Sequence, residues 1–234
     1  MSKFIFSSKE ELLNQAKKDY ACKEGLEWAK KQVSLETILK EIPINYRIWC
    51  ILKRYSQFID DCSWEKLNRL DWAYLLSQQP QLSSFCSYWE KLEGCDWLYL
   101  LSLQPQLSEH CLSWEKIDGE DWITLILKQP KFSDRCPWEK LDGWDWSYLL
   151  SKQPQHSKFC SFWEKLRGLD WSILLSKQPQ FSNICPWEKL ERFDWLRLLS
   201  KQPQFSEYCD LEKLDDEDWV NLLHKQPQLA KFRK

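Results

Sequence analysis

The dipeptide Asp-Trp recurs along most of this chain at intervals of 24 or 25 residues. Each copy has a leucine three residues after the tryptophan and a proline eight residues after it, and every complete copy has a cysteine fourteen residues after it. A fixed period of this length is typical of repeat proteins, whose units pack against the units before and after them. The recurring tryptophans are Trp72, Trp97, Trp122, Trp146, Trp171, Trp195 and Trp219.

The spacing within one copy predicts a short α-helix. Trp146, Leu149 and Leu150 lie at offsets 0, +3 and +4, which form one face of a helix. We place the aspartate of each Asp-Trp pair at the N-cap of this helix, where it would accept hydrogen bonds from free backbone N–H groups. The proline then ends the helix, because the residue before a proline is disfavoured in the α conformation. The same proline is expected to open a second short helix, as in 130–136, with Phe132 and Cys136 facing inward.

A second tryptophan stands eight residues before six of the seven recurring tryptophans, in the phrase Trp-Glu-Lys-Leu or, once, Trp-Glu-Lys-Ile. We expect this phrase to form a 3₁₀-like turn, closed by Gly94, Gly119, Gly143 or Gly168 in four copies. The one-residue difference in repeat length falls between the cysteine and this phrase, which predicts a surface loop there. The second aromatic row consists of Trp64, Trp89, Trp114, Trp138, Trp163 and Trp187, with Leu211 in the last copy.

Helices this short are marginal in water by themselves, so their stability must come from stacking. The 16 tryptophans suit this role, since one ring can bury about 150–250 Å². We therefore predict an all-α fold, an α-solenoid of 24–25-residue repeats with a helical N-terminal cap. The expected parts are the cap at 1–45, in which Ser8 and Glu11 form a capping box, and a repeat solenoid at 46–234. The solenoid divides into a degenerate first repeat at 46–70, six full repeats at 71–217 and a partial capping repeat at 218–234.

Charge and hydropathy argue against several classes of protein. The formal net charge is −2, and basic and acidic residues are interspersed, so a binder of nucleic-acid phosphates is not expected. No stretch approaches 18 apolar residues, and the N-terminal apolar run is too short for a signal peptide. These observations predict a cytoplasmic protein that does not enter a membrane.

The cysteines recur once per repeat, which argues against disulfides. Helices of neighbouring repeats pack about 8–10 Å apart, farther than the Cα atoms of a disulfide usually lie. No Cys-x-x-Cys or Cys/His cluster is present, so no metal site is expected. The sequence therefore predicts a column of buried thiols.

Catalysis has little support in the sequence. His110, His156 and His224 occupy three different repeat positions, and no catalytic motif is present, so we expect neither an enzyme nor a cofactor. The Glu-Lys pairs of the Trp-Glu-Lys-Leu phrases are expected to form inter-repeat ion pairs or a solvated face. The Gln-Pro-Gln tripeptides are not expected to be polyproline ligands, because each proline stands alone at a helix break.

Positions that vary between copies are candidates for function, because the recurring positions build the scaffold. Three such positions carry aromatic, apolar or basic residues: two residues after the tryptophan, directly before the aspartate, and directly before the cysteine. Exposed tyrosines are typical anchors of protein interfaces, although the first row could equally be incidental surface aromatics, and the third could be partly buried against the next copy. The candidates for partner binding are Tyr74, Tyr99, Tyr148, Ile173 and Arg197 in the first row, Trp144 and Phe193 in the second, and Phe85, Phe159 and Tyr208 in the third.

The pattern DWxxLLxxxP with a following short helix, over about residues 46–234, resembles the leucine-rich repeat variant class. The resemblance implies an α-helix alternating with a shorter 3₁₀-like helix in each unit of about 24 residues. Tryptophan stands where that class favours smaller aliphatic residues, and the cysteine cluster that can hold an iron–sulfur centre beside such repeats is missing. Residues 21–52 are also similar to a short helical module of bacterial and phage proteins without assigned activity.

The expected function is a non-catalytic scaffold that presents an extended repeat surface to a partner protein. One alternative is binding of single-stranded nucleic acid, with one base stacked or contacted per repeat. Another is a phage-encoded inhibitor that occludes a host protein, which the similarity of residues 21–52 alone suggests.

Overall fold

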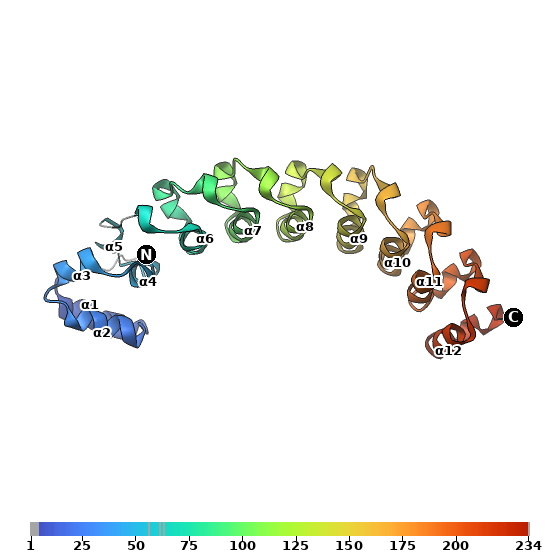
Figure 1. The fold of residues 1–234 in the computed structure, drawn as a ribbon, viewed down its shortest axis with the longest axis horizontal. Coiled ribbons are helices and arrows are strands. Elements are labelled where there is room, and N and C mark those ends of the chain that lie inside the picture. The colour runs from blue at the N-terminus through green and yellow to red at the C-terminus, as the bar shows by residue number, and fades with distance from the viewer. Residues whose placement is uncertain (1–4, 56, 61, 63, 234) are drawn as a thin grey trace. The chain divides into compact units, whose positions relative to one another are not determined.

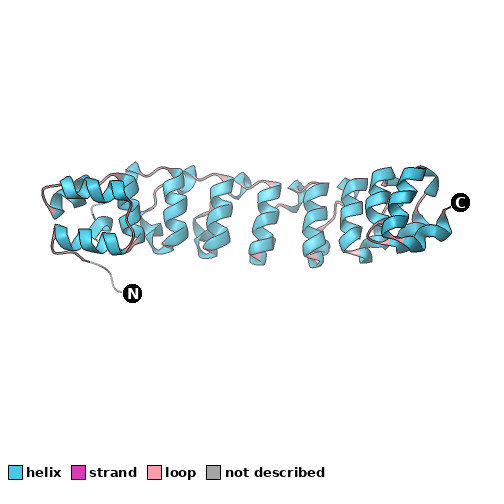
Figure 2. Ribbon diagram, turned by 90° about the horizontal axis from the view of Figure 1, so that it is seen from below, coloured by secondary structure: helices cyan, strands magenta, loops and turns pink. Residues whose placement is uncertain are grey.

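The computed structural model describes residues 5–55, 57–60, 62 and 64–233. These residues form helices and connecting loops without any strand, so the prediction of an all-α solenoid is confirmed. The chain forms two compact units, Met1–Ile117 and Asp118–Lys234. Within each unit the α-helices of successive repeats pack side by side as one layer, and the 3₁₀ segments form a second layer (Figures 1 and 2).

The first unit begins with a helical cap. Ser8 caps α1 by accepting a hydrogen bond from the backbone N–H of Glu11, as predicted, but the Glu11 carboxylate binds Ser7 instead of completing a capping box. In the degenerate repeat, Ile48 and Ile51 of α4 stand where the recurring tryptophan and leucine would, and both are buried. Ser56, which stands where the proline would, lies outside the described residues. The helices of this part are α1 (Lys9–Lys18), α2 (Lys23–Lys31), α3 (Leu35–Glu41), α4 (Ile44–Leu52) and α5 (Gln57–Asp60).

Each repeat consists of a 3₁₀ turn at the Trp-Glu-Lys phrase, an α-helix and a 3₁₀ segment that starts at the recurring proline. In the first unit these are η1 (Trp64–Lys66), α6 (Arg69–Gln78), η2 (Pro80–Phe85), η3 (Trp89–Lys91), α7 (Gly94–Leu103), η4 (Pro105–His110) and η5 (Trp114–Lys116). In the second unit they are α8 (Gly119–Lys128), η6 (Pro130–Arg135), η7 (Trp138–Lys140), α9 (Gly143–Lys152), η8 (Pro154–Phe159), η9 (Trp163–Lys165), α10 (Gly168–Lys177), η10 (Pro179–Ile184), η11 (Trp187–Lys189), α11 (Arg192–Leu199), η12 (Pro203–Tyr208), η13 (Leu211–Lys213), α12 (Asp216–Lys225) and η14 (Pro227–Phe232).

The repeat aspartates are not N-caps, so that prediction is wrong. Each α-helix begins two residues before its aspartate, which therefore occupies the third helical position. In α9, the Asp145 carboxylate accepts a hydrogen bond from the backbone N–H of the N-cap residue Asp142. The Asp142 carboxylate in turn accepts one from the backbone N–H of Asp145. This reciprocal capping box satisfies two otherwise unpaired N–H groups, and the helix dipole favours both carboxylates at this end.

The repeat glycines do not close the Trp-Glu-Lys turn either. Each is the first residue of an α-helix, and no described glycine has a positive φ. Their role is close approach to the next repeat. A Cβ atom on Gly143 would lie 2.5 Å from the Lys165 carbonyl oxygen and 2.6 Å from an Asp170 carboxylate oxygen. Arginine takes this position in α6 and α11, and it binds the aspartate of the following repeat, as in the Arg69–Asp96 pair at 3.1 Å.

Polar side chains join successive repeats through backbone carbonyl groups. The first glutamine of each Gln-Pro-Gln lies just after its α-helix, and Gln178 Nε2 donates to the Ser151 carbonyl of the preceding helix at 3.1 Å. The second glutamine holds the first, because Gln180 Nε2 donates to Gln178 Oε1 at 2.8 Å. The proline begins the 3₁₀ segment after a helix break, as predicted.

The lysines of the Trp-Glu-Lys phrases also bind carbonyl groups. Lys165 Nζ donates to the carbonyls of Glu139 at 2.7 Å and Leu141 at 3.2 Å, and Lys116 does the same to Glu90 and Leu92. The Glu139 side chain is exposed. Of the two expected alternatives, the exposed glutamate fits the solvated face, while Lys165 and Lys116 form charge-assisted bonds to carbonyls in and just after the preceding 3₁₀ turn instead of ion pairs.

The core combines buried tryptophans with the predicted column of thiols. Trp97, Trp146 and Trp171 are fully buried on the inner faces of their helices. Cys86, Cys111, Cys136, Cys160 and Cys185 are buried and form no disulfide, which confirms the predicted column over these five repeats, while Cys209 is half-buried. Burial raises the pKa of the Cys136 thiol to about 12, so this thiol stays protonated and packs as a small apolar group.

Candidate partner-binding surface

Two of the three variable positions lie together on one exposed face of the α-helices. The residue before each aspartate and the residue two after each tryptophan are four apart, so they are neighbours on a helix surface. A third position, four residues further on, continues the same column. In α9 the three residues are Trp144, Tyr148 and Lys152. We call the surface formed by these three positions in successive helices the helix face.

In the second unit the helix face has an apolar centre. Trp144 is 47% exposed, Tyr148 is 42% exposed and Phe193 is 74% exposed, which are high values for rings of this size. The aliphatic side chains of Leu169 and Ile173, on α10, lie between the aromatic residues of α9 and α11 in the order of the repeats. The sequence thus places five large apolar side chains on three successive helices.

In the first unit the helix face carries the remaining predicted tyrosines. Tyr74 is 50% exposed on α6, and Tyr99 is 41% exposed on α7. The Ser77 hydroxyl donates to the Tyr99 hydroxyl at 3.3 Å, which ties the two helices together at this surface. Leu70 and Leu103 are also exposed on this face, at 62% and 50%.

A hollow of about 240 Å³ opens on the helix face between α8 and α9. Burial raises the pKa of the Asp145 carboxyl, and the neighbouring carboxylates of Asp142, Asp118 and Glu120 add to this rise, while a backbone hydrogen bond from Asp142 opposes it. The aromatic wall of the hollow suits an apolar or aromatic side chain of a partner. The lining residues are Glu120, Ile123, Thr124, Trp144, Asp145 and Tyr148.

The third variable row lies elsewhere, in the 3₁₀ layer. Phe159 stacks on Trp138 at a centroid distance of 4.8 Å, and Trp138 in turn stacks on the buried Trp146 at 5.2 Å. The same three-ring stack is formed by Phe85 on Trp64 and by Tyr208 on Trp187. These contacts are made within one repeat, so Phe85, Phe159 and Tyr208 pack against the scaffold as well as facing solvent.

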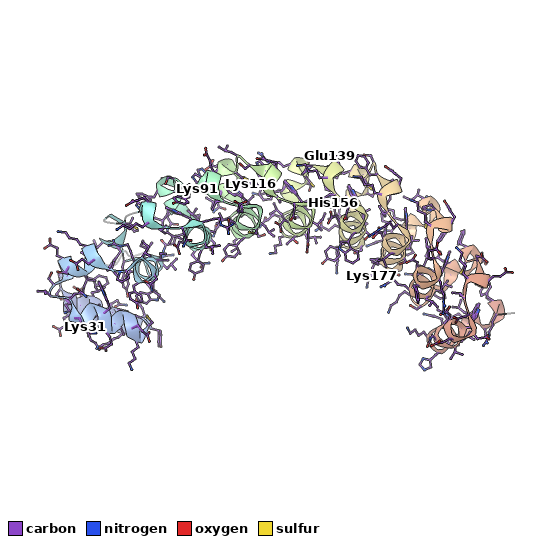
Figure 3. The ribbon with its side chains drawn as sticks, in the orientation of Figure 1. Lys31, Lys91, Lys116, Glu139, His156 and Lys177 are labelled. Atoms are coloured by element: carbon purple, nitrogen blue, oxygen red, sulfur yellow. The ribbon has the colours of Figure 1, made fainter. Side chains whose placement is uncertain are left out.

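The sequence reasoning overlooked the last position of the helix face. It is lysine in all five repeats of the second unit, and all five side chains are exposed. The sequence could have indicated this row, because the lysine recurs in five copies, four residues after a position predicted to be exposed on the same helix. Lys177 is seen on this side of α10 in Figure 3. The row consists of Lys128, Lys152, Lys177, Lys201 and Lys225.

A second concave feature lies in the helical cap. A cavity of about 370 Å³ is bounded mainly by apolar side chains of α1 to α4, among them Leu12, Trp28, Ile38 and Trp49. Its walls offer few polar groups to orient a ligand. Among the residues that the structure describes, no cluster of His, Cys, Asp and Glu is arranged to hold a metal ion.

Comparison with known proteins gives no relative from which a function could be transferred. No family model, no curated protein sequence and no solved structure matches the chain. Over the described residues, no helix combines the length and apolar character that crossing a bilayer requires.

Proposed function

We propose that this chain is a non-catalytic protein-interaction module that binds a partner through its helix face. The observation that carries the proposal is the row of large apolar side chains that the second unit exposes at positions where the scaffold does not need them. Each repeat of the second unit already buries the tryptophan of its Asp-Trp pair, at no more than 6% exposure, so Trp144, Tyr148 and Phe193 contribute little to folding at 42–74% exposure. Partly exposed aromatic residues with aliphatic residues between them are typical of interface anchors.

Several features of the scaffold support this function. The helix face is built on regular elements whose ends are fixed by capping boxes and by bonds to neighbouring repeats. A surface held in this way changes little on binding, so less conformational entropy is lost when a partner docks. The hollow beside Trp144 gives a partner side chain a place to anchor.

The proposal is tested by affinity purification with two matched variants. The helix-face variant carries Trp144→Ala, Tyr148→Ala and Phe193→Ala, and the 3₁₀-layer variant carries Phe159→Ala, Ile184→Ala and Tyr208→Ala. Each removes three large side chains that are exposed or partly exposed, from opposite layers of the same unit. Circular dichroism and urea unfolding first establish that both variants fold.

Extracts of cells that naturally contain the chain are treated with nuclease and passed over each immobilised protein. We expect the wild type and the 3₁₀-layer variant to capture one protein in stoichiometric amount. The helix-face variant should fail to capture it. If only the 3₁₀-layer variant loses the partner, the binding surface lies at Phe159, Ile184 and Tyr208 instead. Retention by both variants would contradict the helix face, and capture that disappears with nuclease would favour nucleic-acid binding.

A further inference from the structure

We infer that the partner of the second unit is a polypeptide segment whose apolar side chains are bordered by acidic residues. This inference rests on the proposed function and adds the chemistry of the partner. It follows from the lysine row, which runs beside the apolar centre of the helix face through all five repeats of this unit. Four of these lysines belong to the last turn of their helices, and Lys201 follows α11 by two residues.

The five lysine side chains are available to a ligand. Each is exposed, and none has a carboxylate partner among the ion pairs of the described residues. By contrast, Lys165 and Lys189 of the Trp-Glu-Lys phrases are used within the scaffold, where they bind backbone carbonyls. Lys152 Nζ lies 5.9 Å from the centre of the Tyr148 ring, so the basic row and the aromatic row are in direct proximity.

The helix dipole by itself does not require these lysines. A cation near a helix C-terminus is favourable, but Gln78 and Leu103 occupy the same position in α6 and α7 of the first unit. The row is therefore a property of the second unit's surface. The lysine row therefore occurs in the same unit as the exposed aromatic residues Trp144 and Phe193 of the helix face.

The geometry fits a single polypeptide segment. The three positions of the helix face span eight residues, or about 12 Å along a helix axis, which is about the diameter of one α-helix with its side chains. A segment that crosses α9, α10 and α11 would place apolar side chains over Trp144, Leu169 and Phe193. Acidic side chains along one of its edges would then meet Lys152, Lys177 and Lys201, and this complementarity would orient the segment and accelerate its binding.

A nucleic acid fits the same surface less well. Bases stack on aromatic rings, whereas the centre of this face is interrupted by the aliphatic Leu169 and Ile173. The opposite edge of the face carries the carboxylates of Glu120 and Glu217, and the exposed N-cap residues Asp142 and Glu191 lie at the same ends of the helices. These carboxylates would repel a phosphate backbone that crossed the helices.

The test is selection of a displayed library of random peptides on the full-length chain, followed by fluorescence anisotropy with the selected peptides. The lysine-row variant carries Lys152→Gln, Lys177→Gln and Lys201→Gln, which copies the glutamine found at this position in α6. The control variant carries Lys131→Gln, Lys158→Gln and Lys231→Gln, which removes the same charge from exposed lysines of the 3₁₀ segments. A fluorescent oligothymidine serves as the nucleic-acid probe.

We expect the selected peptides to combine aromatic or aliphatic residues with a negative net charge. Their binding should be about tenfold weaker in the lysine-row variant and in high salt, and unchanged in the control variant. Selected peptides that are neutral or basic, or that bind the lysine-row variant with full affinity, would overturn this inference and leave the proposed function standing. Failure to select any peptide that discriminates wild type from the helix-face variant would overturn both. Tight binding of oligothymidine that depends on the lysine row would replace the peptide with a nucleic acid.

Discussion

His156 occupies a core position that leucine or phenylalanine holds in the other repeats. Its side chain is 5% exposed, and its Nε2 lies 2.8 Å from Gln153 Oε1, while Nδ1 is buried without a partner. Burial lowers the pKa of this imidazole, and the nearby Lys158 lowers it further. The neutral ring is therefore the form that the fold accommodates, at the cost of one unsatisfied polar atom. The equivalent residues are Leu82, Leu107, Phe132, Phe181, Phe205 and Leu229.

We predict that His156→Leu stabilises the protein, and more so at acidic pH. Removing the unsatisfied nitrogen should raise the free energy of unfolding by about 1 kcal/mol at neutral pH. Because the folded-state pKa is lowered, the unfolded chain binds a proton below about pH 6.5 that the folded chain does not, so wild-type stability falls as the pH falls through that value. Urea unfolding of both proteins at pH 5 and pH 8 checks this, and a difference independent of pH would contradict it.

The repeat glycines give a second prediction for single residues. Gly143→Ala should lower the free energy of unfolding by about 1–3 kcal/mol, because its Cβ would overlap the Lys165 carbonyl oxygen. Gly25→Ala is the control: its Cβ would meet Cys22 Sγ at 3.2 Å and the Tyr46 ring at 3.4 Å, and alanine is the better helix former. Thermal unfolding compares the two variants. A Gly143→Ala protein as stable as the wild type would show that the repeats can separate at low cost.

Among the elements, the junction between α-helix and 3₁₀ segment carries the most specific polar contacts. The first glutamine of Gln-Pro-Gln follows its own helix and also binds at the C-terminal end of the preceding one, as Gln202 binds the Ser176 carbonyl at 3.1 Å and Gln226 binds the Ser200 carbonyl at 2.9 Å. One side chain thus satisfies a carbonyl group that the preceding helix leaves unpaired at its end.

Gln178→Ala is therefore expected to cost about 1 kcal/mol of stability, since the Ser151 carbonyl loses its donor. The exposed Gln180, whose side-chain amide donates to Gln178 Oε1 and not to the preceding repeat, provides the comparison. Its substitution by alanine should cost less than half as much. Equal losses of stability in urea unfolding would mean that the bond to the preceding repeat contributes nothing.

The sequence predicted these elements well but misplaced their ends. Helix positions, the proline break and the buried cysteines follow from spacing alone, because periodicity reports which side chains face inward. The aspartate was placed at the N-cap because a single sequence does not show which of two polar residues, Asp142 or Asp145, is outside the helix. The role of Gly143 depends on the approach of Lys165 and Asp170 from the next repeat, and such contacts between copies leave no mark on local spacing.

The candidate surface was predicted in part for the same reason. Variable positions before the aspartate and after the tryptophan are four residues apart, so their common face follows from helix geometry. The position before the cysteine was grouped with them because it also varies. Its location in the other layer depends on the stacking of Phe159 on Trp138, which requires the path of the chain after the proline.

For the whole molecule, the contacts connect successive repeats. In the second unit α10 packs against α9 and α11, and the side-chain bonds to carbonyls likewise connect each repeat with the one before it. Stability in such an array is approximately a sum of repeat and neighbour terms, so local damage should remain local.

We accordingly predict that Trp171→Ala loosens its neighbours before it affects the cap. Removing this fully buried ring should cost about 3–5 kcal/mol. Hydrogen exchange measured by mass spectrometry should accelerate most in α9, α10 and α11, and least in α1 to α3. Uniform acceleration along the chain would show a single cooperative unit instead.

The bonds from Gln178 and Lys165 end on backbone carbonyl groups, which every residue possesses whatever its side chain. These bonds therefore do not depend on which side chains the preceding repeat exposes, so the surface residues of neighbouring repeats can change independently. Duplication or exchange of whole repeats would preserve the joints, while each helix face remains free to diversify. The chain is in this sense a modular platform, on which new recognition surfaces could be assembled from interchangeable units without redesign of the core.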